Sequence, residues 1–69
     1  MHKMKEPWTG NVVGRMHVYG IKNDELARRC GYSPQYLSMV LNGKRPVTQN
    51  TKDVIFVSLS SIEQEVRHE

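Results

Sequence analysis

Residues 23–45 have the sequence NDELARRCGYSPQYLSMVLNGKR, which predicts two short helices joined by a tight turn. Gly31 suits the left-handed conformation in which helices often end. Ser33 is a strong N-cap, and Pro34 suits the first helical position because its missing N–H has no helical partner there. Since the connection is too short for antiparallel packing, the two helices are expected to cross steeply.

The first of these helices is expected over residues 24–30, with Asn23 as its N-cap, and the second over residues 34–42. Ala27 supplies the small side chain that a steep crossing needs where two backbones approach. The apolar contacts of the pair are expected at Leu26, Cys30, Tyr32, Leu37 and Val40. Burial of these residues leaves an exposed face on the second helix, made of Pro34, Gln35, Ser38, Met39 and Asn42, with Tyr36 beside it. This face offers hydrogen-bonding groups and has no acidic residue, so it can enter a major groove without repelling phosphates.

A further helix is predicted before the pair, over residues 10–19, with Thr9 as its cap. Val12, Val13 and Met16 fall at helical spacing and are expected to face the core. Trp8 is expected to cover one end of that core.

The sequence after the pair is ambiguous at Val54-Ile55-Phe56-Val57, because a β-branched run alone predicts a strand. The same segment also carries apolar residues at the spacing of one helix face, and a lone strand has no partner in an otherwise helical chain. We therefore predict a helix over residues 50–67, capped by Asn50 or Thr51. The expected fold is all-α, a compact bundle of four or five short helices.

The chain has 69 residues and a formal net charge of +3, which is unevenly distributed. Residues 1–45 carry eight Lys or Arg against three acidic residues, or +5, whereas residues 46–69 carry two against four, or −2. A basic segment favours an anionic partner, most often nucleic acid, although charge alone fits a mildly basic soluble domain equally well. Residues 1–8 are expected to form a flexible arm and residues 9–67 the folded domain.

Several classes of protein are disfavoured by what the sequence lacks. Cys30 is the single cysteine and cannot form an internal disulfide, and three scattered histidines make no zinc ligand set. No apolar run is long enough for a membrane span, and no paired carboxylates or phosphate-binding glycine loop are found. We therefore expect no catalytic residues, no metal and no cofactor, and the composition fits a reducing cytoplasm.

Residues 23–45 resemble the helix-turn-helix of lambda-repressor-like DNA-binding domains, the Cro/C1 or XRE-type family. The small residue Ala27, the turn residue Gly31 and the apolar positions match the family pattern, and the ending Leu41-Asn42-Gly43-Lys44 is frequent in it. The family usually places Ser or Thr where Lys22 stands.

The resemblance implies a role for each matching position. Gln35 is the best candidate for reading a base, since an amide can pair bidentately with adenine N6 and N7, and Met39 suggests contact with a thymine methyl group. Asn23 and Asn42 fall where family members contact phosphates. Tyr36 is compatible both with a phosphate contact and with covering the edge of the core. The implied DNA-binding residues are Asn23, Ser33, Pro34, Gln35, Tyr36, Ser38, Met39, Asn42, Lys44 and Arg45.

The function that the resemblance implies is sequence-specific binding of double-stranded DNA by a small phage- or mobile-element-type transcriptional regulator. The oligomeric state stays open, and a homodimer on an inverted-repeat operator is one arrangement that would fit. The alternative is a helical protein-interaction module, an antitoxin or adaptor that acts through a partner protein.

Overall fold

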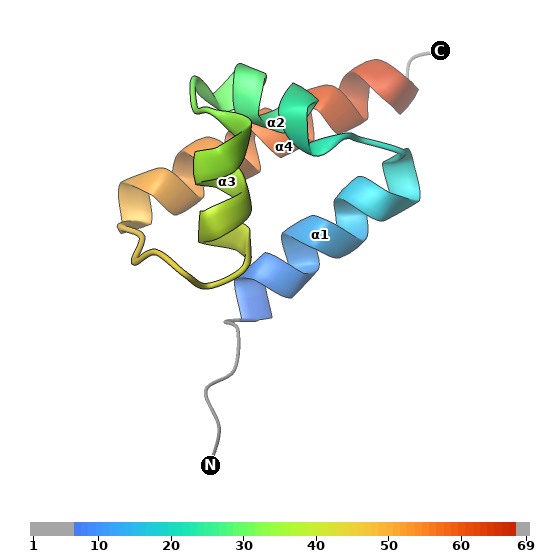
Figure 1. The fold of residues 1–69 in the computed structure, drawn as a ribbon. Helices are drawn as coiled ribbons and strands as arrows, with labels where there is room; N and C mark the ends of the chain where they lie inside the picture. Colours follow the sequence, from blue (N-terminus) through green and yellow to red (C-terminus); the bar gives the residue numbers. More distant parts are fainter. Residues whose placement is uncertain (1–6, 68–69) are drawn as a thin grey trace.

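The computed structural model describes residues 7–67, which fold into four helices and no strand (Figure 1). The all-α expectation is confirmed, and the run at residues 54–57 is helical. None of the helices in this part of the chain combines the length and hydropathy needed to cross a membrane. The helices are α1 (Pro7–Tyr19), α2 (Asn23–Cys30), α3 (Pro34–Leu41) and α4 (Gln49–Arg67).

The two long helices, α1 and α4, run side by side, and the short pair α2 and α3 packs over them (Figure 1). Helix α2 contacts both α3 and α4, while α3 also contacts α1. All four helices contribute to one core, which also takes in the turn residue Ile21. Its buried side chains are Val12, Met16, Ile21, Leu26, Ala27, Leu37, Val40, Leu41, Ile55, Leu59 and Ile62.

Helix α1 begins at Pro7, earlier than the predicted start at residue 10, so Trp8 and Thr9 lie within the helix. Pro7 and Trp8 of the predicted arm over residues 1–8 are therefore helical. Residues 1–6 lie outside the described part of the chain. Trp8 packs against the core beside Phe56, with ring centroids 6.1 Å apart, as expected for a cover at one end.

The predicted core position of Val13 is wrong, because its side chain is 49% exposed. The buried stripe of α1 runs through Thr9, Val12 and Met16, which are spaced by three and four residues. Val13 follows Val12 by one residue, which turns it by about 100° around the helix axis. Its side chain therefore lies at the edge of the stripe.

The N-cap of α2 is Lys22, and the prediction of Asn23 is wrong by one residue. The Leu26 N–H donates to the Lys22 carbonyl at 3.1 Å, which places Asn23 inside the first turn. Lys22 makes no side-chain capping hydrogen bond. At the other end, Gly31 has a φ of 82°, in the left-handed conformation predicted for it.

The start of α3 is confirmed in detail, since the Tyr36 N–H donates to Ser33 Oγ at 3.1 Å. The helix ends at Leu41 with Asn42 as its C-cap, one residue before the predicted end. Helix α4 begins at Gln49, one residue before the predicted start. Its N-cap is Thr48, and not Asn50 or Thr51 as predicted. The Thr48 hydroxyl accepts the Thr51 N–H at 3.2 Å.

An ion pair joins α1 to α4. The Arg15 guanidinium donates to both Glu63 carboxylate oxygens at 2.7 Å, and Arg15 also reaches Ser60 Oγ at 3.4 Å. The bond from Arg15 lowers the pKa of Glu63, whereas burial of this carboxylate opposes the shift. A second pair, Arg29 with Glu65, joins α2 to α4 at a more exposed position.

Candidate nucleic-acid interface

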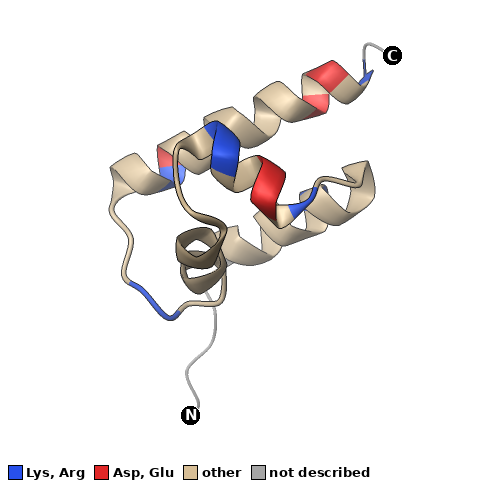
Figure 2. Ribbon diagram, turned by 45° about the horizontal axis from the view of Figure 1, so that its top comes forward, with Lys and Arg blue, Asp and Glu red and all other residues tan. Residues whose placement is uncertain are grey.

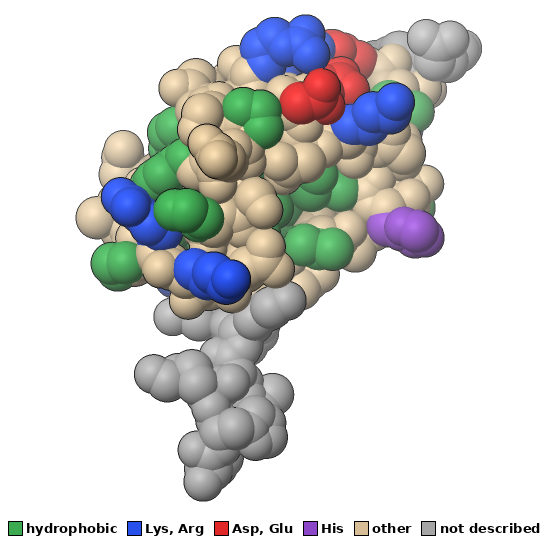
Figure 3. Space-filling view, viewed as in Figure 1, with side chains coloured by type: hydrophobic (Ala, Val, Ile, Leu, Met, Phe, Trp, Pro, Cys, Tyr) green, Lys and Arg blue, Asp and Glu red, His purple; other side chains and the backbone are tan. Residues whose placement is uncertain are grey.

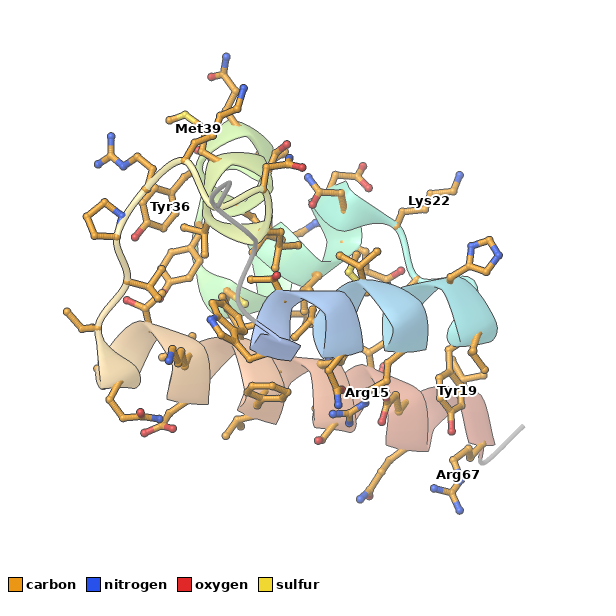
Figure 4. All side chains as sticks on the ribbon, turned by 90° about the horizontal axis from the view of Figure 1, so that it is seen from below. Arg15, Tyr19, Lys22, Tyr36, Met39 and Arg67 are labelled. Atoms are coloured by element: carbon orange, nitrogen blue, oxygen red, sulfur yellow. The ribbon has the colours of Figure 1, made fainter. Side chains whose placement is uncertain are left out.

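Helix α3 lies on the side of the molecule that faces the viewer in Figure 1. Its inner side is fixed by Leu37, Val40 and Leu41, all of which are buried in the core. The residues between them must therefore face outward. Met39 lies on the part of α3 farthest from α4, with Tyr36 between Met39 and α4 (Figure 4).

The structure brings the predicted base-reading residues to this outer side of α3. Ser33, Pro34 and Gln35 are exposed at the start of the helix, and Ser38 and Met39 are half-buried one turn further on. None of them carries a charge. We call the set Ser33, Pro34, Gln35, Ser38 and Met39 the α3 outer face.

Two basic residues lie next to this face, in the loop between α3 and α4. Lys44 and Arg45 are exposed, and they form the blue part of that loop in Figure 2. On the surface that faces the viewer in Figure 3, the basic side chains lie toward the edges, with acidic ones beside them only at the upper edge, and uncharged groups cover most of the middle. This distribution suits a duplex, whose phosphates flank the base edges of the groove.

The two asparagines predicted to contact phosphates already hold neighbouring parts of the chain. Asn23 Nδ2 donates to the Pro34 carbonyl at 3.1 Å and so links the start of α2 to the start of α3. Asn42 Nδ2 donates to the Ser38 carbonyl at 2.8 Å and to Ser38 Oγ at 3.3 Å. An amide N–H₂ has two donors, so Asn23 keeps one of them while Asn42 uses both.

The side chain of Tyr36 is half-buried and packs against the core. Its ring meets the edge of Tyr32, with centroids 5.0 Å apart and an interplanar angle of 68°. The guanidinium of Arg45 lies over the same Tyr36 ring, 5.6 Å from its centroid. This contact was not predictable from the sequence, because nothing in local spacing relates a loop arginine to a tyrosine nine residues earlier.

The structure also shows an open groove between α1 and α3, with a volume of about 750 Å³. This groove was not predicted from the sequence. Its apolar lining includes Val13 and Leu41, and the amides of Asn23 and Asn42 stand at its border with α2 and α3. The only sequence signal was the spacing of Gly10 and Gly14, which line the groove and leave it open.

No group of three or more His, Cys, Asp or Glu that could hold a metal is found among residues 7–67. Cys30 is half-buried, and this burial raises the pKa of its thiol, which suits packing better than reactivity.

Comparison with known proteins identifies this part of the fold. A family model described as helix-turn-helix matches residues 19–51, which include all of α2 and α3 and the loop after them. The family consists of DNA-binding domains and is not typically enzymatic. Searches of curated proteins and of solved structures found no match. Residues 19–51 therefore match a helix-turn-helix family, which supports the resemblance to lambda-repressor-like domains of the Cro/C1, XRE type.

Proposed function

We propose that this protein binds double-stranded DNA in a sequence-specific manner, with α3 in the major groove. The observation that carries the proposal is the α3 outer face, an uncharged polar surface beside the exposed cations of Lys44 and Arg45. The match of residues 19–51 to a helix-turn-helix family supports it independently. The biological role we propose is that of a small Cro- or repressor-like transcriptional regulator of the phage or mobile-element type.

Gln35 is the proposed base-reading residue. It is exposed on the first turn of α3, the end that enters the groove in helix-turn-helix docking. An exposed amide can make a bidentate pair with adenine, and the thioether of Met39 offers an apolar surface to a thymine methyl group one turn further on. Ser33, Pro34 and Ser38 complete the surface that would lie against the groove.

Contacts with the DNA backbone are proposed for the loop cations and for Asn23. Lys44 and Arg45 can bind phosphates as charged donors, which gives affinity without sequence information. Asn23 retains one amide N–H for a phosphate after its bond to Pro34. Asn42 would have to give up one of its bonds to Ser38 in order to do the same.

A protein-interaction role is the second candidate, and the groove between α1 and α3 is the observation in its favour. Val13 lines this groove, and its side chain is 49% exposed. An apolar groove binds a partner with little dependence on salt, whereas DNA binding weakens steeply as salt rises. A salt titration therefore separates the two functions.

Selection of bound duplexes from a random pool tests the proposal. We expect enrichment of one short site, with a base preference that fits a single recognition helix. An inverted repeat with half-sites about 34 Å apart would indicate a homodimer on the operator. A pool that shows no enrichment after repeated rounds would contradict sequence-specific binding, and the protein-interaction role would replace it.

A further inference from the structure

The loop between α3 and α4 holds one cation on an aromatic ring. The guanidinium carbon of Arg45 lies 5.6 Å from the centroid of the Tyr36 ring, within the distance at which a cation is attracted to a ring face. Three cations in the described chain have such a contact, the others being Arg15 on Phe56 and Lys52 on Trp8. The adjacent loop cation Lys44 is not among them.

The Tyr36 ring is a fixed platform. The backbone N–H of Tyr36 donates to Ser33 Oγ in the first turn of α3. The Tyr36 ring packs on the core and makes an edge contact with the ring of Tyr32. Because Tyr36 belongs to α3 itself, a group that rests on its ring is held at a defined place relative to the α3 outer face.

Arg45 keeps its charge for an external anion. The two ion pairs among residues 7–67 use Arg15 and Arg29. Among residues 7–67 no hydrogen bond or ion pair uses the Arg45 guanidinium, so its N–H groups can match two phosphate oxygens at once. The cation–π contact with Tyr36 therefore costs Arg45 none of the donors that a phosphate contact needs.

We propose that Tyr36 is a positioning residue for DNA binding, which holds the Arg45 guanidinium beside α3 for a backbone phosphate. This inference rests on the proposed function. It assigns Tyr36 neither to a base nor to a phosphate, but to ordering a loop arginine before DNA arrives. A guanidinium that is ordered before DNA arrives loses less side-chain entropy on binding. Removal of this ordering should therefore weaken affinity by roughly 2–10-fold.

The test is a double-mutant cycle between Tyr36 and Arg45, measured as affinity for a selected site and for random duplex. Tyr36→Leu removes the ring, and we expect a roughly 2–10-fold loss on both duplexes. Tyr36→Phe keeps the ring face and should bind like wild type. In an Arg45→Ala background, Tyr36→Leu should cause no additional loss, because the arginine it positions is gone. In a Lys44→Ala background, which serves as the matched control, the full loss should persist.

Two results would overturn the inference. Wild-type affinity of Tyr36→Leu would show that the ring does nothing for binding, and an equal loss with and without Arg45 would assign Tyr36 a direct or structural role. Thermal unfolding identifies a variant that fails to fold, in which case Tyr36→Met, whose longer and more flexible side chain can adapt to the space left by the ring, takes its place in the cycle. If wild-type protein does not distinguish the selected site from random duplex, the proposed function fails instead.

Discussion

At the scale of single residues, Ala27 shows how little space the fold leaves inside the helix pair. It lies in α2, which packs against both α3 and α4, and its side chain has no exposed surface. We expect Ala27→Glu to abolish cooperative unfolding, because an unpaired buried carboxylate costs several kcal/mol, roughly the stability of a domain this small. Thermal denaturation followed by circular dichroism measures the effect.

Arg28→Glu is the matched control, since Arg28 is exposed on the same helix. This variant adds the same carboxylate next to Ala27, and it should unfold cooperatively. If Ala27→Glu were as stable as the control, the packing described for α2 would be wrong.

Two glycines, one within α1 and one directly after it, separate the effect of steric room for a side chain from the effect of backbone conformation. A Cβ added at Gly14 or at Gly20 would meet nothing within 4 Å, but Gly20 has a φ of 68° and Gly14 lies within the helix. We expect Gly14→Ala to stabilise the domain by about 1 kcal/mol through helix propensity. Gly20→Ala should destabilise it by about 1–2 kcal/mol because alanine resists the left-handed conformation.

Chemical denaturation of the two variants checks both signs. A loss of stability in Gly14→Ala would mean that α1 is not a regular helix at that position. Equal effects of the two substitutions would mean that the turn after α1 does not have its described conformation.

At the scale of helices, the local signals in the sequence were sufficient for the turns and insufficient for long-range contacts. Ser33, Pro34 and Gly31 act within a few residues, so the boundaries between α2 and α3 were predictable. The N-caps of α2 and α4 were each displaced by one or more residues, because several neighbouring polar residues compete for such a position. The pairing of Arg15 with Glu63 spans 48 residues and depends on how α1 lies along α4, which no local pattern encodes.

That pairing gives the domain a dependence on pH. The bond from Arg15 lowers the pKa of Glu63 in the folded protein below its ordinary value. The ionised carboxylate therefore contributes stability at neutral pH, and this contribution is lost as the pH falls through the lowered folded-state pKa. We expect Glu63→Gln to be less stable than wild type at pH 7 and the difference to shrink in acid.

Glu65→Gln is the control, because its pair with Arg29 lies at an exposed position, where ion pairs contribute little. Denaturation midpoints at neutral and acidic pH compare the two variants. A constant difference between wild type and Glu63→Gln across this pH range would show that the carboxylate does not stabilise the contact between α1 and α4 through its charge.

At the scale of the whole molecule, the four helices bring together groups that the sequence keeps apart. Arg45 lies in the loop that joins α3 to α4 (Figure 2), and its guanidinium lies over the ring of Tyr36 in α3. Four residues of the α3 outer face, Pro34, Gln35, Ser38 and Met39, were predictable from the sequence because they are the complement of the buried residues of this helix. The groove between α1 and α3 was not predictable, because it depends on how α1 is rotated about its axis. The sequence pattern predicts that Val13 faces the core, whereas Val13 lines the groove and is exposed.

Removal of Arg45 should change affinity without changing specificity. We expect Arg45→Ala to weaken binding to the selected site and to random duplex alike, and to reduce the dependence of log affinity on log salt by about one unit. Binding measured at several salt concentrations provides both values. An unchanged salt dependence would show that Arg45 makes no phosphate contact.

The most direct test of sequence reading by α3 is the specificity of Gln35→Ala, measured as the ratio of its affinities for the selected site and for random duplex. Loss of a bidentate base contact should cost about 1–3 kcal/mol on the selected site, leave binding to random duplex nearly unchanged, and relax the preference at one base pair. Since Gln35 is exposed, its removal should leave the fold intact. A wild-type ratio in this variant would contradict base reading by Gln35 and, with it, the assignment of the α3 outer face to the major groove.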